Sequence, residues 1–254
     1  MLHKIQARLP GDFPWEIRYV DSIASTNTAL RGAPHGSVLI AGHQTGGRGR
    51  MGRTFHSPAG KGLYLSVLLR PQCHAQELMH LTCAAAVAAM QAMPISCAIK
   101  WTNDLVVGKR KLGGILTEMS LNPDGTVAWV IVGIGINCCH RPEDFPEDIR
   151  SIATSLSMET GQETEIAEIA ARLLLSLKEM SDSLLSGKPE MLSLYRRSCI
   201  TLGKEISILR GEDVRHGTAV DVDEEGALVV RFPDGSLEAV NSGEVSIRGM
   251  YGYV

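Results

Sequence analysis

Three closely spaced arginines stand out in this sequence as groups suited to binding an anion. They lie on the glycine-rich segment Gly46-Gly47-Arg48-Gly49-Arg50-Met51-Gly52-Arg53. Glycine lets backbone N–H groups approach an anion closely, and a guanidinium offers a fixed fork of donors that suits phosphate or carboxylate. The segment therefore predicts a loop that orders around an anionic ligand such as a nucleotide. A solvated basic loop is the alternative.

Two common phosphate-binding motifs do not fit this loop. Residues 47–52 satisfy G-x-G-x-x-G, but a dinucleotide fingerprint needs a helix directly afterwards, and here Pro58 and Gly60 intervene before an apolar run. No Gly-Lys-Ser/Thr closes a Walker loop.

A second group of polar residues follows about fifty positions later. It reads Lys100-Trp101-Thr102-Asn103-Asp104, then, after six residues, Lys111-Leu112-Gly113-Gly114-Ile115-Leu116. A turn at Gly108 would fold the second segment back on the first, so that Lys100, Asn103, Asp104 and Lys111 converge on one pocket. The alternative is a hairpin with surface lysines, in which Asp104 pairs with Lys100.

Hydrophobic periodicity predicts the elements that position these groups. Alternation or short apolar runs indicate strands over residues 15–21, 38–41, 62–69, 97–101, 111–119 and 126–136, the last two joined as a hairpin through Asn122-Pro123-Asp124-Gly125. Helices are predicted to start near Ser25 with Thr26 or Asn27 as the cap, and over 76–93, 165–185 and 189–197. From Lys204 onward, short strands are predicted at 205–209, 217–222, 227–232, 237–240 and 245–247.

Length and composition are those of a soluble globular protein with one large and one small domain. The chain has 254 residues, 44% of them hydrophobic, and a formal net charge of -3, which argues against general binding to nucleic acid. Its six cysteines lack C-x-x-C spacing, so reduced thiols are expected. The N-terminus has no apolar signal core, and no apolar run approaches the about 20 residues of a membrane span, so a cytoplasmic protein without membrane attachment is expected.

Taken together, the ordered motifs resemble the biotin protein ligases. Besides the arginine loop and the two lysine segments, the resemblance includes Gln44-Thr45 before the loop and the triplet Ser25-Thr26-Asn27. It also includes Gly133-Ile134-Gly135-Ile136-Asn137 and the C-terminal segment Gly243-Glu244-Val245-Ser246-Ile247-Arg248. The match runs from about residue 15 to the end of the chain.

The resemblance implies an α+β fold with a central mixed sheet and helices, like that of class II aminoacyl-tRNA synthetases and biotin–lipoate ligases. Residues 1–200 would form this catalytic domain, and residues 201–254 a small SH3-like β-barrel. Only about twenty residues precede the triplet Ser25–Asn27. A short-class ligase without a DNA-binding domain is therefore expected, acting as a monomer or homodimer.

The resemblance also implies the reaction. The carboxylate of biotin would attack the α-phosphate of ATP to give biotinyl-5′-AMP, and a lysine of a biotin carboxyl carrier protein domain would then displace AMP. Mg²⁺ is expected on the triphosphate. The residues with expected catalytic roles are Arg48, Lys111 and Asp104, with Arg48 and Lys111 on the carboxylate and α-phosphate and Asp104 as a proton acceptor or orienting group. Those expected at biotin are Ser25, Thr26, Asn27, Gln44, Arg48, Gly49, Arg50, Lys111 and Gly114. Those expected at ATP are Arg48, Arg50, Arg53, Phe55, Lys100, Asn103, Lys111 and Asn137, with Arg53 on the outer phosphates.

Two positions depart from the family pattern. Thr102 stands where proline is usual, and Phe55 stands where tryptophan is common. Both changes leave the charged groups in place. A lipoate–protein ligase and a non-enzymatic nucleic-acid-binding module remain as alternative functions.

Overall fold

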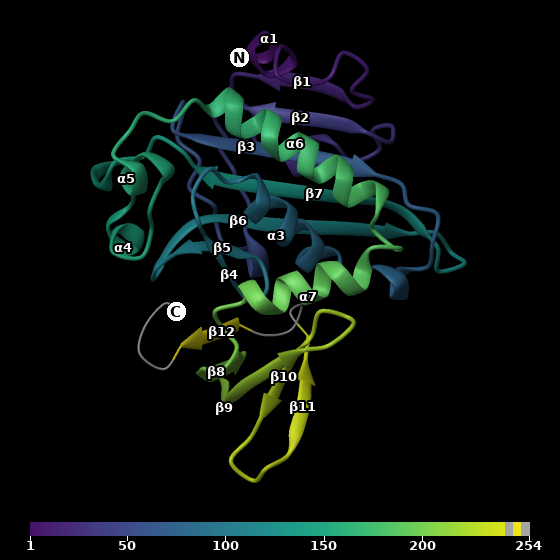
Figure 1. Ribbon diagram of the computed structural model, residues 1–254, viewed down its shortest axis with the longest axis vertical. Helices are drawn as coiled ribbons and strands as arrows, with labels where there is room; N and C mark the ends of the chain where they lie inside the picture. The colour runs from purple at the N-terminus through teal and green to yellow at the C-terminus, as the bar shows by residue number, and fades with distance from the viewer. Residues whose placement is uncertain (242–245, 250–254) are drawn as a thin grey trace.

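The computed structural model describes residues 1–241 and 246–249 (Figure 1). Positions 242–245 and 250–254 lie outside the described residues. With them lie Gly243, Glu244 and Val245 of the C-terminal motif.

Seven strands form one mixed sheet in the order β1-β2-β3-β7-β6-β5-β4. The β1–β2 pair is parallel, and the other neighbouring pairs are antiparallel. The strands are β1 (Glu16–Val20), β2 (Ser37–Ala41), β3 (Gly62–Leu69), β4 (Ala98–Lys100), β5 (Asp104–Val107), β6 (Arg110–Leu121) and β7 (Val127–Asn137). This confirms the predicted mixed sheet.

The β6–β7 hairpin was predicted from its turn residues, and the structure confirms it. Asn122 N–H donates to the carbonyl of Thr126, and Gly125 adopts a left-handed φ of 82° that disfavours residues with a Cβ. Both strands are long and lie inside the sheet, with β7 at its centre, and they carry several of the site residues.

Helices cover one face of the sheet, as Figure 1 shows for α3, α6 and α7. The helices are α1 (Leu2–Gln6), α2 (Thr26–Ala29), α3 (Leu81–Ala92), α4 (Glu147–Arg150), α5 (Leu156–Thr160), α6 (Ile166–Asp182) and α7 (Lys188–Ser198), with short 3₁₀ turns η1 (Arg50–Gly52), η2 (Ala75–Leu78) and η3 (Pro142–Asp144). Alanine-rich α3 is buried nearly all round because it lies between the sheet and α6.

Two helix starts differ from the prediction. The helix predicted from residue 76 begins at Leu81, because Glu77 accepts a hydrogen bond from the N–H of His74 and closes a separate 3₁₀ turn first. The residue that precedes the first turn of α2 is Ser25, which is extended, whereas Thr26 and Asn27 are already helical. The hydroxyl and carboxamide of those two residues are therefore available for contacts with the sheet.

The C-terminal strands form a second, five-stranded antiparallel sheet in the order β11-β10-β9-β8-β12. They are β8 (Glu205–Arg210), β9 (Asp213–Val222), β10 (Leu228–Arg231), β11 (Leu237–Val240) and β12 (Ser246–Gly249). In Figure 1 this sheet lies beyond α7 from the large sheet. Within the described residues, β11 pairs with β10 and β12 pairs with β8. Strand β9 starts four residues before the predicted position.

Two further observations concern the whole described chain. All six cysteines are free thiols, as predicted. Within residues 1–241 and 246–249, no helix is long and apolar enough to cross a membrane.

Candidate ligand-binding site

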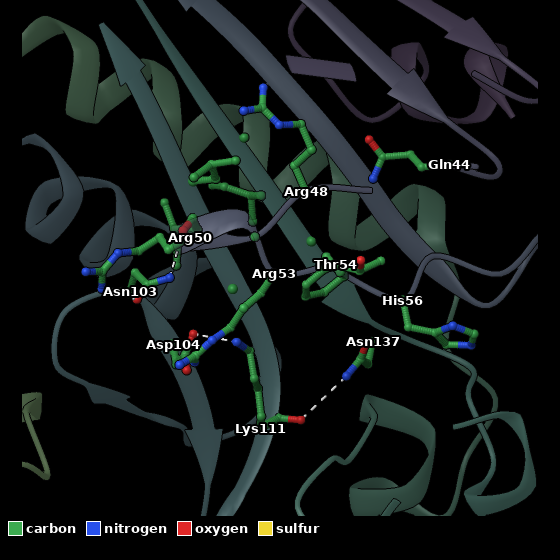
Figure 2. Close-up of a pocket in the computed structure, with 18 of the residues that line it drawn as sticks. Gln44, Arg48, Arg50, Arg53, Thr54, His56, Asn103, Asp104, Lys111 and Asn137 are labelled. Atoms are coloured by element: carbon green, nitrogen blue, oxygen red, sulfur yellow. Dashed lines mark hydrogen bonds and ion pairs between the residues drawn. The ribbon is translucent and has the colours of Figure 1, made fainter. Parts of the chain in front are cut away.

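A cavity of about 550 Å³ opens on the sheet face opposite α3 and α6. This is within the range of pockets that hold a small ligand. Every residue predicted for the site lines it: Ser25, Thr26, Asn27, Gln44, Arg48, Gly49, Arg50, Arg53, Phe55, Lys100, Asn103, Asp104, Lys111, Gly114 and Asn137. Figure 2 shows ten of the lining side chains by name.

The floor of the cavity is made of glycines on neighbouring strands. Gly114 pairs with Gly135, and Gly133 pairs with Leu116, so these positions share one face of the sheet. A Cβ at Gly133 would overlap the carboxamide of Asn27, and one at Gly135 would overlap the Phe55 ring. The glycines therefore leave room for side chains that come from α2 and the arginine loop.

The arginine loop, residues 46–55, folds back on itself over this floor. Gly49 N–H donates to the carbonyl of Arg53 at 2.7 Å, and Phe55 N–H donates to that of Gly47 at 2.9 Å. Met51, at the tip of the turn that the Gly49–Arg53 hydrogen bond closes, has a left-handed φ of 54°. The turn sends the three guanidinium groups in different directions.

Each arginine of the loop has a different environment. Arg50 donates to Oδ1 of Asn103 at 3.0 Å. In Figure 2 Arg53 extends toward Asp104 and Lys111, whereas the Arg48 side chain points away from them. Arg48 instead donates to Glu118 at 3.1 Å. Arg48 was expected with Lys111 on the carboxylate and α-phosphate, and Arg53 on the outer phosphates. Arg53 is the arginine that extends toward Lys111 in Figure 2, and the assignment of these groups to parts of the substrates stays a prediction.

The Lys111 ammonium pairs with Asp104 at 2.6 Å. A pair between Asp104 and Lys100 was the alternative considered from the sequence. Lys111 is also fixed through its backbone, because its N–H donates to the carbonyl of Ile152 and its own carbonyl accepts from Thr154. The cation is thus held at a defined place beside Gly114, whose Cβ would lie 3.3 Å from the Lys111 Nζ.

Burial and neighbouring charge set the ionisation of Arg50. Burial lowers the pKa of Arg50, the charge of Asp104 opposes this shift, and the nearby Arg53 lowers the pKa further. An arginine remains protonated in spite of such shifts. The cavity centre therefore carries several cations around one carboxylate, which is a surplus of positive charge that an anion can neutralise.

A polar network occupies one end of the cavity. Gln44 Oε1 accepts from the N–H of Thr26 at 2.9 Å and from its hydroxyl at 3.1 Å, while Gln44 Nε2 donates to Ser57. The buried Ser66 hydroxyl lies 2.7 Å from Thr26 Oγ1 and 2.6 Å from Asn27 Oδ1. These contacts fix the polar groups that a ligand's amide or ureido head would meet.

An apolar wall, which sequence reasoning missed, lies at the other end. It consists of Phe145, Ile149, Ile152 and Ala153, and Asn137 lies beside it, donating to the carbonyl of Thr154 at 2.9 Å. The segment that carries this wall has short helical turns and no sustained periodicity, so no sequence signal indicated it. The ring of His140 stacks on Phe145 at 4.8 Å and supports the wall from behind.

The strand pair β4–β5 forms the back of the cavity. The Trp101–Thr102 peptide bond is cis, and the carbonyl of Thr102 accepts from the buried Tyr195 hydroxyl at 3.0 Å. The Trp101 indole donates to the carbonyl of Gly226 at 3.0 Å, which links the small sheet to the cavity wall.

Comparison with known proteins decides the family. The family model described as Biotin/lipoate A/B protein ligase matches residues 19–137, and the Biotin protein ligase C terminal domain matches residues 201–248. A biotin--[acetyl-CoA-carboxylase] ligase of Paracoccus denitrificans is 32% identical over 237 residues, covering 89% of this chain and 98% of that protein. The chain belongs to the biotin protein ligase family.

Two further relatives agree with this assignment. The bifunctional ligase/repressor BirA of Bacillus subtilis is 35% identical over 239 residues, or 90% of this ligase and 73% of BirA. A solved structure of the Aquifex aeolicus biotin protein ligase, in complex with biotin and ATP, superposes with a TM-score of 0.76 at 30% identity and covers 92% of this chain and 99% of that one. The expected fold class is therefore confirmed, and this ligase has the cavity on the face where its family motifs converge.

Proposed function

We propose that this ligase activates biotin with ATP as biotinyl-5′-AMP and then transfers biotin to a lysine of a biotin carboxyl carrier protein domain. The observation that carries the proposal is the order of groups along the cavity. The cavity brings together a fixed polar network, an apolar wall, and the cations Arg50, Arg53 and Lys111. In Figure 2 Gln44 of the network lies well apart from Lys111 and Asn137, which are hydrogen-bonded to the segment that carries the wall.

This order matches the two substrates. The ureido head of biotin fits the network of Thr26 and Gln44, and a flat adenine base fits the apolar wall beside Phe145. The carboxylate of biotin and the α-phosphate of ATP then meet in the centre. Two anions repel each other, so the central cations lower the cost of bringing them together and of the charge that develops at phosphorus.

The chemistry consists of two displacements. In the first, a carboxylate oxygen forms a bond to the α-phosphorus, the bond to the bridging oxygen breaks, and pyrophosphate leaves. In the second, the neutral amine of the carrier lysine attacks the acyl carbon, AMP leaves and the amine loses a proton. We assign Asp104 an orienting role in the first step, because its carboxylate pairs with the Lys111 ammonium at 2.6 Å.

Mg²⁺ is proposed to enter with the triphosphate of ATP as part of that substrate. Among the residues that the structure describes, there is no group of three or more His, Cys, Asp or Glu side chains that could hold a metal ion. The cations at the cavity centre are well placed to share the phosphate charge with it.

The test is biotin-dependent exchange of labelled pyrophosphate into ATP, followed by transfer of labelled biotin to a carrier domain. A parallel reaction with lipoate decides between the two substrate classes in the matched family model. Exchange that depends on lipoate but not on biotin, or no exchange with either acid, would contradict the proposal.

A further inference from the structure

Glu118 lies on the cavity face of the sheet, just beyond the glycine floor. It follows Gly114 and Leu116 at every second position of β6, so the three residues point to the same side. Its Oε2 accepts from the Asn27 carboxamide at 2.9 Å, and its Oε1 accepts from Arg31 at 2.8 Å and from Arg48 at 3.1 Å. One carboxylate thus joins α2, the large sheet and the arginine loop.

The carboxylate of Glu118 is well fixed and remains charged. Burial raises the pKa of Glu118, but the hydrogen bonds from Asn27 and Arg31 and the charge of Arg48 outweigh this effect, and the net pKa is lowered. Asn27 is itself held, because it also donates to the carbonyl of Leu116 at 3.2 Å. Glu118 is therefore a rigid anchor on the sheet.

Arg48, by contrast, is the exposed partner of the pair. Its side chain is 48% exposed, whereas that of Glu118 is 17% exposed. It lines the cavity, yet its guanidinium points away from the central cations in Figure 2. An ion pair with such exposure contributes little to stability and exchanges readily for a stronger anionic partner.

We propose that Glu118 is a counter-ion latch. It holds Arg48, and with it the arginine loop, when the cavity contains no anion, and it releases Arg48 to the carboxylate of biotin or the phosphates of ATP. Glu118 is a positioning residue in this scheme, since it acts through Arg48. The inference rests on the proposed function for the identity of the anions.

Arg31 makes the exchange possible. When Arg48 leaves, Arg31 remains on the same Oε1 atom, so the half-buried carboxylate keeps a cation and is not left uncompensated. A site with Arg48 as the single partner would hold it more tightly. Arg31 therefore weakens the ion pair between Arg48 and Glu118, and it keeps the Glu118 carboxylate neutralised when Arg48 leaves.

The experiment compares Glu118→Gln, Arg31→Ala, Arg48→Ala and the double variant Arg48→Ala/Glu118→Gln with the wild-type chain. Glutamine keeps the shape of residue 118 and a carbonyl oxygen for Asn27, but it removes the charge. Hydrogen exchange of the amides of residues 46–55 is measured without ligands, and the dissociation constants of MgATP and of biotin are measured by calorimetry.

Glu118→Gln is expected to speed exchange in the ligand-free loop and to tighten MgATP or biotin binding by about twofold to fivefold, the range for a half-exposed ion pair. Arg31→Ala is expected to shift binding in the opposite direction. In the Arg48→Ala background, Glu118→Gln should have no further effect on binding.

Three results overturn the latch. The first is that Glu118→Gln and the wild type have equal rates of hydrogen exchange at residues 46–55 and equal dissociation constants for MgATP and biotin. The second is an effect of Glu118→Gln that persists unchanged without Arg48, which would make Glu118 a structural support of Asn27 alone. The third is a wild-type chain that binds neither MgATP nor biotin, which contradicts the proposed function as well. The first two leave the proposed function intact, so the failures are distinguishable.

Discussion

Replacing Lys111 with alanine tests the centre of the proposed site. Lys111 lies on β6, and its ammonium is 2.6 Å from the Asp104 carboxylate. The backbone N–H and carbonyl of Lys111 are both hydrogen-bonded to the segment that carries the apolar wall. The ammonium is thus placed before any substrate arrives, which is the condition under which a charge stabilises a transition state most.

The expected magnitude follows from that placement. Loss of one preorganised donor to a developing oxyanion costs about 10²–10³-fold in rate. The loss of stability is expected to be much smaller than this loss of rate, because Asp104 keeps the neighbouring charge of Arg50 when the ammonium is removed and is not left uncompensated. Lys111→Ala should therefore remain folded while adenylation slows by two to three orders of magnitude.

The assay is biotin-dependent ATP–pyrophosphate exchange, with thermal unfolding measured in parallel. Lys109→Ala is the matched control, since Lys109 is exposed on the β5–β6 turn two residues earlier and does not line the cavity. A loss smaller than about threefold in Lys111→Ala, or an equal loss in Lys109→Ala, would refute the role assigned to the Lys111 ammonium.

Further predictions concern the floor, the wall and the loop. Gly133→Ala should lower the free energy of unfolding by about 1–3 kcal/mol in chemical denaturation, because its Cβ overlaps the Asn27 carboxamide, whereas Gly11→Ala meets no neighbour within 4 Å and should lack this steric cost. Burial lowers the pKa of His140 from 6.5 to about 4, so the unfolded chain binds the proton first as pH falls. The contribution of His140 to the free energy of unfolding is full above pH 6.5 and is lost between pH 6.5 and about 4. In His140→Phe the free energy of unfolding should therefore fall less steeply across this window. A pH profile identical to that of the wild type would contradict the assignment to His140. Amides of residues 46–55 should exchange more slowly with biotin and ATP bound than without them, and equal protection in both states would count against a loop that orders on its ligand.

The strands and most of the site were predictable from the sequence because their signals are local. Alternation and short apolar runs located six of the seven strands of the large sheet, and the Asn122–Gly125 turn indicated the β6–β7 hairpin. The short strand β5 (Asp104–Val107) was not predicted. The site residues were predictable because the arginine loop and the two lysine segments resemble family motifs, and all of them line one cavity. Their individual roles remain predictions.

What the sequence did not indicate depends on contacts between distant residues. Arg48 and Glu118 are 70 positions apart, and neither periodicity nor a motif connects them. The apolar wall around Phe145 comes from a segment with short turns that becomes ordered by packing and by its bonds to Lys111. In the same way, the side chain of Glu77 determines where α3 begins through a single bond to His74.

The Trp101 indole joins the small sheet to the large one at the back of the cavity. Its N–H donates to the carbonyl of Gly226, and the Cys83 thiol of α3 approaches the same carbonyl. A chain cut ahead of residue 201 would leave a buried indole donor without its acceptor and uncover part of α3. A chimaera that borrows the small sheet from a relative therefore needs a β9–β10 turn that returns a carbonyl to this indole. Otherwise the graft disturbs the end of β4 and the turn after it, which present Lys100 and Asn103.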